Sequence, residues 1–133
     1  MLDDHHALRA REHRNYPNLR GKHVLIVEDD PVIAVDYHFQ LKDVGATAEG
    51  FKATNRDALS YLASHHVDAA IVDFLLCDGT SEAIIADLKE RGIPFIVVSG
   101  CAFRIHGEVD ASHVLSKPVW PGEIWRALSN VMH

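Results

Sequence analysis

The sequence predicts a single α/β domain, in which a five-stranded parallel sheet is covered by helices on both faces. From residue 23 onward, short apolar segments alternate with amphipathic segments along the chain. The apolar segments are continuous runs, which are typical of strands buried on both faces. A chain of 133 residues is also long enough to bury one contiguous core.

The first strand and the first helix carry the clearest signals. Residues 23–27, with the sequence HVLIV, are predicted to form a buried strand. Asp30 and Pro31 then supply a helix N-cap followed by proline at the first helical position, and Gly45 supplies a helix end. The apolar residues of this helix form two neighbouring stripes, Val32, Val35 and Phe39, and Ile33, Tyr37, Leu41 and Val44.

The remaining elements follow by the same alternation of patterns. We predict further strands at 47–51, 68–73, 94–98 and 113–116, of which the first is weaker and lies at the outside of the sheet. We predict further helices at about 55–65, between Ser81 and Gly92, and after Pro121. Residues 101–112 have weak apolar periodicity and contain Gly107. We therefore expect the fourth helix to be short or irregular.

Composition and charge exclude several classes of function. No apolar run approaches the roughly 18 residues of a membrane span, and the N-terminus lacks the apolar stretch of a signal peptide. Cys77 and Cys101 form no CxxC pair, which favours a cytoplasmic protein with reduced thiols. The net charge is −6, and residues 1–22 carry five Arg/Lys against three Asp/Glu, or +2, so the rest carries −8. An acidic body argues against nucleic acid as a direct partner.

Two units are predicted, an N-terminal arm over residues 1–22 and a domain over residues 23–133. In the arm, Asp3 and Asp4 precede Arg9, Arg11 and Arg14, an order that suits the dipole of a short helix. Two interpretations remain open for it. The arm is either a partly ordered, solvated extension or a helix that docks on the domain or on a partner.

Polar residues follow four of the five predicted strands. Glu28 and Asp29 follow the first, Asp73 ends the third, Ser99 follows the fourth, and Lys117 follows the fifth. Because the carboxyl ends of parallel strands meet at one edge of a sheet, we expect these side chains to converge. Helix caps and solvated turns would account for any one of them, but not for four of the five strand ends together.

Three carboxylates at one rim cannot all stay charged without compensation. Mg²⁺, a hard cation that takes oxygen ligands, would provide it, and Lys117 would add a second positive charge. With the hydroxyl of Ser99 these groups would clamp a tetrahedral dianion, and Asp73 at the centre would be the nucleophile on phosphorus. Without metal, we expect the pKa of at least one carboxyl to rise.

Four segments resemble motifs of the receiver domain of two-component response regulators. They are VLIVEDDP (24–31), IVDFLLCDG (71–79), VVSG (97–100) and SKPV (116–119), and the match spans about 110 of the 133 residues. The resemblance implies a flavodoxin-like, doubly wound (βα)5 three-layer sandwich with the strand order 2-1-3-4-5.

The resemblance also implies a role for each site residue. Asp73 would accept a phosphoryl group from the phosphohistidine of a histidine kinase or a histidine phosphotransfer protein. Ser99 and Lys117 would contact that group, and the Lys117–Pro118 peptide bond would be cis. Mg²⁺ would be bound by Asp29, by Asp73, by the backbone carbonyl of Leu75 and, mainly through water, by Glu28. Asp30 fits a helix cap better than a ligand.

The sequence departs from the receiver pattern in its switch. Most receivers place an aromatic residue three positions before the lysine, where this chain has Val114. RGIPFIVVSG (91–100) is similar to a subgroup of single-domain receivers bearing a PFxFATG-type motif and found in alphaproteobacteria, with Val97, Val98 and Ser99 in place of Phe-Ala-Thr. We expect a switch that orders or shifts residues 100–112 instead.

These inferences favour a single-domain response regulator that acts as a phosphate shuttle, a phosphate sink or a protein-binding switch on an unknown target. Its chemistry would be confined to its own phosphorylation and dephosphorylation, so we do not expect an enzyme. The first helix would carry the kinase contact, and Trp120 would either anchor a partner there or cap the core. A degenerate receiver that binds a partner without phosphorylation is the alternative. An aspartyl phosphohydrolase is disfavoured, because position 75 is Leu where such enzymes have a second Asp.

Overall fold

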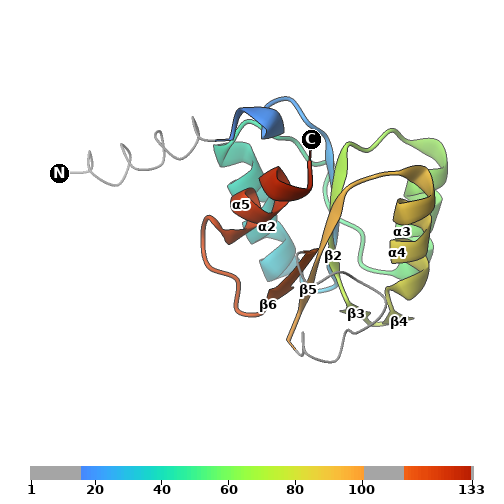
Figure 1. Cartoon of the computed structure of the whole chain (residues 1–133). Coiled ribbons are helices and arrows are strands. Elements are labelled where there is room, and N and C mark those ends of the chain that lie inside the picture. Colours follow the sequence, from blue (N-terminus) through green and yellow to red (C-terminus); the bar gives the residue numbers. More distant parts are fainter. Residues whose placement is uncertain (1–15, 101–112, 133) are drawn as a thin grey trace.

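The computed structural model describes residues 16–100 and 113–132, and four parallel strands form its sheet. The strands are β1 (Val24–Val27), β2 (Ala69–Asp73), β5 (Phe95–Ser99) and β6 (Val114–Ser116), in this order across the sheet. Each neighbouring pair is parallel. The α/β class is confirmed, as are four of the five predicted strands, and Figure 1 shows how the sheet and helices are arranged.

The predicted strand at 47–51 was wrong as a regular strand. Two isolated parallel bridges join this segment to the β1 side, His23 with Thr47 and Val27 with Lys52. Between the two bridges the chain advances five positions from Thr47 to Lys52, but only four positions from His23 to Val27. The segment therefore contains one extra residue. Gly50, at φ +69°, takes the left-handed conformation that accommodates the extra residue. The sheet therefore has four strands and an irregular edge segment beside β1.

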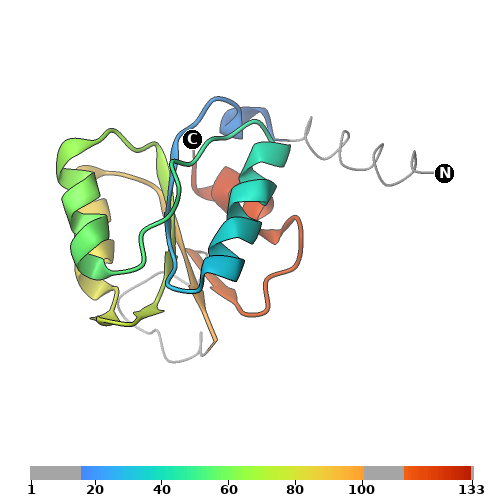
Figure 2. The same ribbon diagram turned by 180° about the vertical axis from the view of Figure 1, so that it is seen from behind.

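Within residues 16–100 and 113–132, two helices cover each face of the sheet. Helices α2 (Pro31–Asp43) and α5 (Glu123–Val131) lie on one face, and α3 (Asn55–Ser64) and α4 (Glu82–Arg91) lie on the other (Figures 1 and 2). Side chains along β1 alternate between two buried clusters. Ile26 packs with α2 and α5, while Val27 packs with α3 and α4. Burial on both faces explains the continuous apolar runs.

Helix α2 begins and ends where the sequence predicts. The side chain of Asp30 accepts a hydrogen bond from the backbone N–H of Val32, so Asp30 is the expected cap. One of the two apolar stripes, including Tyr37 and Leu41, is buried against the sheet. The other stripe consists of Val32, Val35 and Phe39, which are 77%, 45% and 59% exposed. The outer face of α2 is therefore apolar.

Residues 16–22, which the sequence analysis assigned to the arm, pack against the domain. The 3-10 helix η1 (Pro17–Leu19) contacts α5, and Leu19 is fully buried. Asn18 Nδ2 donates to the carbonyl of Ser129 at 3.1 Å. The rest of the predicted arm and the predicted irregular fourth helix, at 1–15 and 101–112, lie outside the described residues. Within the described ranges, no helix is long and apolar enough to cross a membrane.

Candidate metal centre at the carboxyl ends of the strands

A cavity of about 520 Å³ opens at the carboxyl edge of the sheet. Its lining includes all the residues predicted from the strand ends, together with the two residues that follow Asp73. The lining residues are Glu28, Asp29, Asp30, Ile33, Asp73, Phe74, Leu75, Ser99, Gly100 and Lys117. The strands of one parallel sheet therefore deliver these groups to one hollow.

Three carboxylates meet in this cavity. Glu28, Asp29 and Asp73 each offer one oxygen, and the three oxygens lie within 4.8 Å of one another. Glu28 is fully buried and Asp73 is 5% exposed, whereas Asp29 is more open to solvent. A set of carboxylate oxygens fits a hard divalent cation such as Mg²⁺, which keeps several waters and needs few protein ligands.

Lys117 supplies the positive charge of the cavity. Its Nζ lies 3.2 Å from Asp73 Oδ2 and 3.4 Å from Glu28 Oε2. Burial acts to lower the pKa of Lys117, but the charges of Asp73 and Glu28 outweigh it and raise that pKa above its ordinary value. Lys117 is therefore a fixed cation between two buried carboxylates.

Glu28 carries the electrostatic strain of the metal-free site. Burial, followed by the charge of Asp73, raises the pKa of Glu28 to about 7. The backbone N–H of Asp30, which donates to Glu28 Oε1 at 3.1 Å, and the charge of Lys117 act in the opposite direction. The expectation that at least one carboxyl pKa rises without metal is thus confirmed.

The backbone around Lys117 and Ser99 brings their side chains to the same cavity. The N–H of Lys117 donates to the carbonyl of Ser99 at 2.9 Å, continuing the pairing of β5 with β6. The Lys117–Pro118 peptide bond is cis. Ser99 is 7% exposed and lines the cavity beside Gly100.

Sequence reasoning missed a short hairpin that follows Asp73. Strands β3 (Leu75–Leu76) and β4 (Gly79–Thr80) pair antiparallel, and Asp78 in the turn reaches the N-terminus of α3. The dipeptide Asp78-Gly79 is a turn signal that marks such a hairpin. The contact with α3 has no local signal, because it joins residues more than 20 positions apart.

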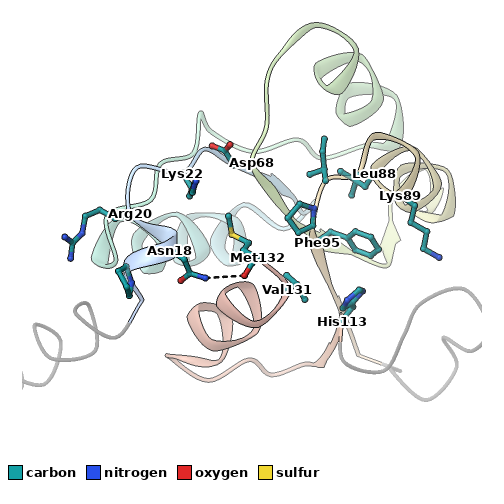
Figure 3. Close-up of a pocket in the computed structure, with 14 residues that line it drawn as sticks. Asn18, Arg20, Lys22, Asp68, Leu88, Lys89, Phe95, His113, Val131 and Met132 are labelled. Atoms are coloured by element: carbon teal, nitrogen blue, oxygen red, sulfur yellow. Dashed lines mark hydrogen bonds between the residues drawn. The ribbon is translucent and has the colours of Figure 1, made fainter.

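A larger cavity, of about 710 Å³, lies at the opposite end of the sheet (Figure 3). It lies among η1, α4, α5 and β5, and contains none of the predicted site residues. Buried apolar side chains line much of it, including Leu88, Phe95 and Met132. We place the candidate site in the smaller cavity, where charged groups converge.

Comparison with known proteins identifies receiver domains as the relatives of this fold. The phyllosphere-induced regulator PhyR of Methylorubrum extorquens is 26% identical over 114 residues, which cover 82% of this chain and 43% of PhyR. The chain thus spans less than half the length of that curated relative. No protein-family model matches the sequence.

Two solved structures show the same likeness. The receiver domain of Erythrobacter litoralis PhyR superposes with a TM-score of 0.77 at 20% identity, covering 86% of this chain and 92% of that one. SdrG of Sphingomonas melonis gives a TM-score of 0.73 at 29% identity, covering 85% and 97%. The structural neighbours are receiver domains of response regulators, and this chain has the receiver fold.

Proposed function

We propose that this chain is a single-domain response regulator of two-component or phosphorelay signalling, phosphorylated on Asp73. The observation that carries the proposal is the convergence of three carboxylates within 4.8 Å of one another beside the ammonium of Lys117. In a receiver fold this cluster lies at the strand ends where a phosphoryl group would be accepted. The similarity to PhyR and SdrG supports the same class.

The residues of the cavity have distinct tasks in the proposed reaction. An oxygen of Asp73 attacks the phosphorus of a phosphohistidine. The new O–P bond forms as the P–N bond of the phosphohistidine breaks. The electron pair of the P–N bond stays on the imidazole nitrogen, and a proton from solvent leaves the imidazole neutral. Lys117 Nζ, already 3.2 Å from Asp73, and the Ser99 hydroxyl hold the phosphoryl oxygens. Together they position the group and balance its charge.

Asp29, Asp73 and the carbonyl of Leu75 would hold Mg²⁺, and Glu28 would act mainly through water. The ion would supply charge neutralisation for the phosphoryl oxygens. The four groups line one cavity, and their oxygens are ligands of the type that Mg²⁺ prefers. Glu28, with a pKa of about 7 in the metal-free protein, would then stay ionised because a cation is present.

The outer face of α2 supports a docking role for a histidine kinase or a histidine phosphotransfer protein. Val32, Val35 and Phe39 form an exposed apolar stripe at the helix that starts beside the cavity. Trp120, in the segment that follows Lys117 and Pro118, is 68% exposed, so it does not cap the core. A cluster of exposed apolar side chains on a stable domain is typical of a protein contact.

The proposed protein turns over no substrate other than its own phosphoryl group. Its proposed location is the cytoplasm, where kinases of this class deliver phosphoryl groups. The downstream target would be a protein, with neither nucleic acid nor membrane as direct partner. The alternative is an adaptor that binds its partner without phosphorylation. Val114 supports this alternative, because most receivers have an aromatic residue of their switch at this position.

Intact-mass measurement separates the two functions. Wild type and Asp73→Ala are incubated with acetyl phosphate or phosphoramidate and Mg²⁺. A labile gain of one phosphoryl group in the wild type alone supports phosphorylation on Asp73. No gain in either protein, although both remain folded, supports the adaptor.

A further inference from the structure

The hairpin that carries Leu75 is attached to the N-terminus of α3 by two side chains. Asp78 Oδ1 accepts from the backbone N–H of Asn55 at 3.0 Å and from its Nδ2 at 3.1 Å. Asp78 Oδ2 accepts a longer bond from the N–H of Arg56 at 3.4 Å. Asn55 Nδ2 also donates to the carbonyl of Thr80 at 3.0 Å. We name Asn55 and Asp78 the clasp.

The clasp acts on the backbone directly opposite Leu75. Thr80, whose carbonyl Asn55 holds, is the antiparallel partner of Leu75 across the hairpin. The N–H of Ser81 donates to the carbonyl of Phe74 at 2.8 Å and closes the base of the loop. The backbone of Leu75 is therefore fixed through its hairpin partner and through the loop base.

The side chain of Leu75 contributes little to fixing that backbone. It is 65% exposed, so core packing does not anchor it. Most of the restraint on the position of its carbonyl must come from backbone hydrogen bonds and from the clasp. A ligand carbonyl with so little packing needs support from a second layer of contacts.

Capping of α3 explains only part of the clasp. Asp78 accepts from the N–H groups of Asn55 and Arg56, which lie in the first turn and have no partner within the helix. Thr54 already caps this helix, since its Oγ accepts from the N–H of Asp57 at 3.1 Å. The bond from Asn55 Nδ2 to Thr80 satisfies no backbone donor of the helix. It joins the helix to the hairpin, which makes it a contact between elements.

We propose that Asn55 and Asp78 are positioning residues for the metal site, which hold the Leu75 carbonyl where Mg²⁺ requires it. This inference rests on the proposed function. Mg²⁺ demands near-ideal octahedral geometry, whereas Ca²⁺ accepts variable distances and more ligands. A loosened carbonyl therefore weakens Mg²⁺ binding more than Ca²⁺ binding. The clasp sets the preference between the two ions.

Calorimetric titration of the metal-free full chain with each ion tests the inference. In Asp78→Ala and in Asn55→Ala, the Kd for Mg²⁺ should rise about tenfold, the lower end of the effect of losing such a supporting contact. The Kd for Ca²⁺ should change by less than about twofold. Asp78→Asn keeps the Oδ1 acceptor for Asn55 and should restore most of the Mg²⁺ affinity.

Thr54→Ala is the matched control. It removes the cap of the same helix without touching the hairpin, so it should lower the melting temperature and leave both Kd values unchanged. Equal weakening of both ions in the clasp variants, or the same change in Thr54→Ala, would overturn the positioning role and leave the proposed function standing. A wild type that binds no Mg²⁺ would overturn both.

Discussion

Each end of the sheet has a cavity, but among the residues that the structure describes, charged side chains are buried only in the cavity at the carboxyl end. At the carboxyl end, Glu28 and Asp73 are buried with Lys117 between them. At the amino end, the larger cavity is lined by buried apolar side chains and by charged ones that are not buried, and Arg20 and Lys89 point away from its centre (Figure 3). Burying like charges together costs stability unless something compensates them. Convergent buried charge, more than cavity volume, is the reason for placing the candidate site at the carboxyl end.

The largest effect we predict is on the rate of phosphorylation, and it should arise only from changes at the carboxyl end. Asp29→Ala removes one of the oxygens that would hold Mg²⁺. We expect the rate of phosphorylation by acetyl phosphate to fall at least about 100-fold, because charge neutralisation by the ion is lost. His113→Ala, in the cavity at the amino end, serves as the control and should phosphorylate at the wild-type rate. A smaller difference between the two variants than tenfold would contradict the assignment.

The two ends also differ in how they make the stability of the fold depend on pH. The folded pKa of Glu28 is raised from 4.5 to about 7, so the metal-free protein holds this proton more tightly than the unfolded chain does. The associated stability is fully present below pH 4.5 and is lost as pH rises through 7, by roughly 3 kcal/mol at most. We expect thermal melting in EDTA to show this loss in the wild type and not in Glu28→Gln.

Asp68, at the amino end, has the opposite dependence. Burial acts to raise its pKa, but the N–H of His23 and the side chain of His66 outweigh burial and lower the pKa below 3.8. The contribution of Asp68 to stability is present above pH 3.8 and is lost as pH falls through the lowered pKa.

The prediction for Glu28 fails if Glu28→Gln and the wild type show the same melting profile between pH 5 and 8. Glu28 would then not carry the charge strain assigned to it.

Mg²⁺ should stabilise the carboxyl end specifically. A ligand that binds only the folded state adds about 2.7 kcal/mol when present at 100 times its Kd. We expect the melting temperature of the wild type to rise by several degrees at pH 8, and that of Asp29→Ala to stay within a degree of its metal-free value. An equal rise in both proteins would indicate a nonspecific effect of salt.

The smallest effect we predict comes from Lys117. In Lys117→Met the carboxylates of Glu28 and Asp73 lose their shared cation, which should cost about 2 kcal/mol in EDTA at pH 8. The cost is below that of a fully buried pair, because the Lys117 side chain is 28% exposed. Urea unfolding measures it, and Lys89→Met at the other end is the control, with an expected change below about 0.5 kcal/mol. Equal losses in both variants would contradict the comparison.

Most of the fold and the residues of the site could be predicted because local patterns report them. Continuous apolar runs mark the buried strands, and polar residues directly after Val27, Val72 and Val98 mark the strand ends. The resemblance to receivers then added roles that the patterns do not contain. Those roles stay predictions here.

The features that sequence reasoning missed depend on tertiary contacts. The segment at 47–52 keeps strand-like hydrogen bonds at both ends, and the extra residue shows only in the spacing of its two bridges to the β1 side. The contact between Asn55 and Asp78 joins separate elements. The two apolar stripes of α2 are equivalent in sequence, and packing alone decides that Phe39 faces outward.

A crystal structure of the chain grown with Mg²⁺ and beryllofluoride would show the phosphoryl acceptor and the metal ligands in one experiment. We expect a beryllofluoride group bonded to a carboxylate oxygen of Asp73 and contacted by Lys117, with one Mg²⁺ about 2.1 Å from oxygens of Asp29, Asp73 and the Leu75 carbonyl. An Asp73 carboxylate without the adduct, or an ion bound away from these three oxygens, would contradict it.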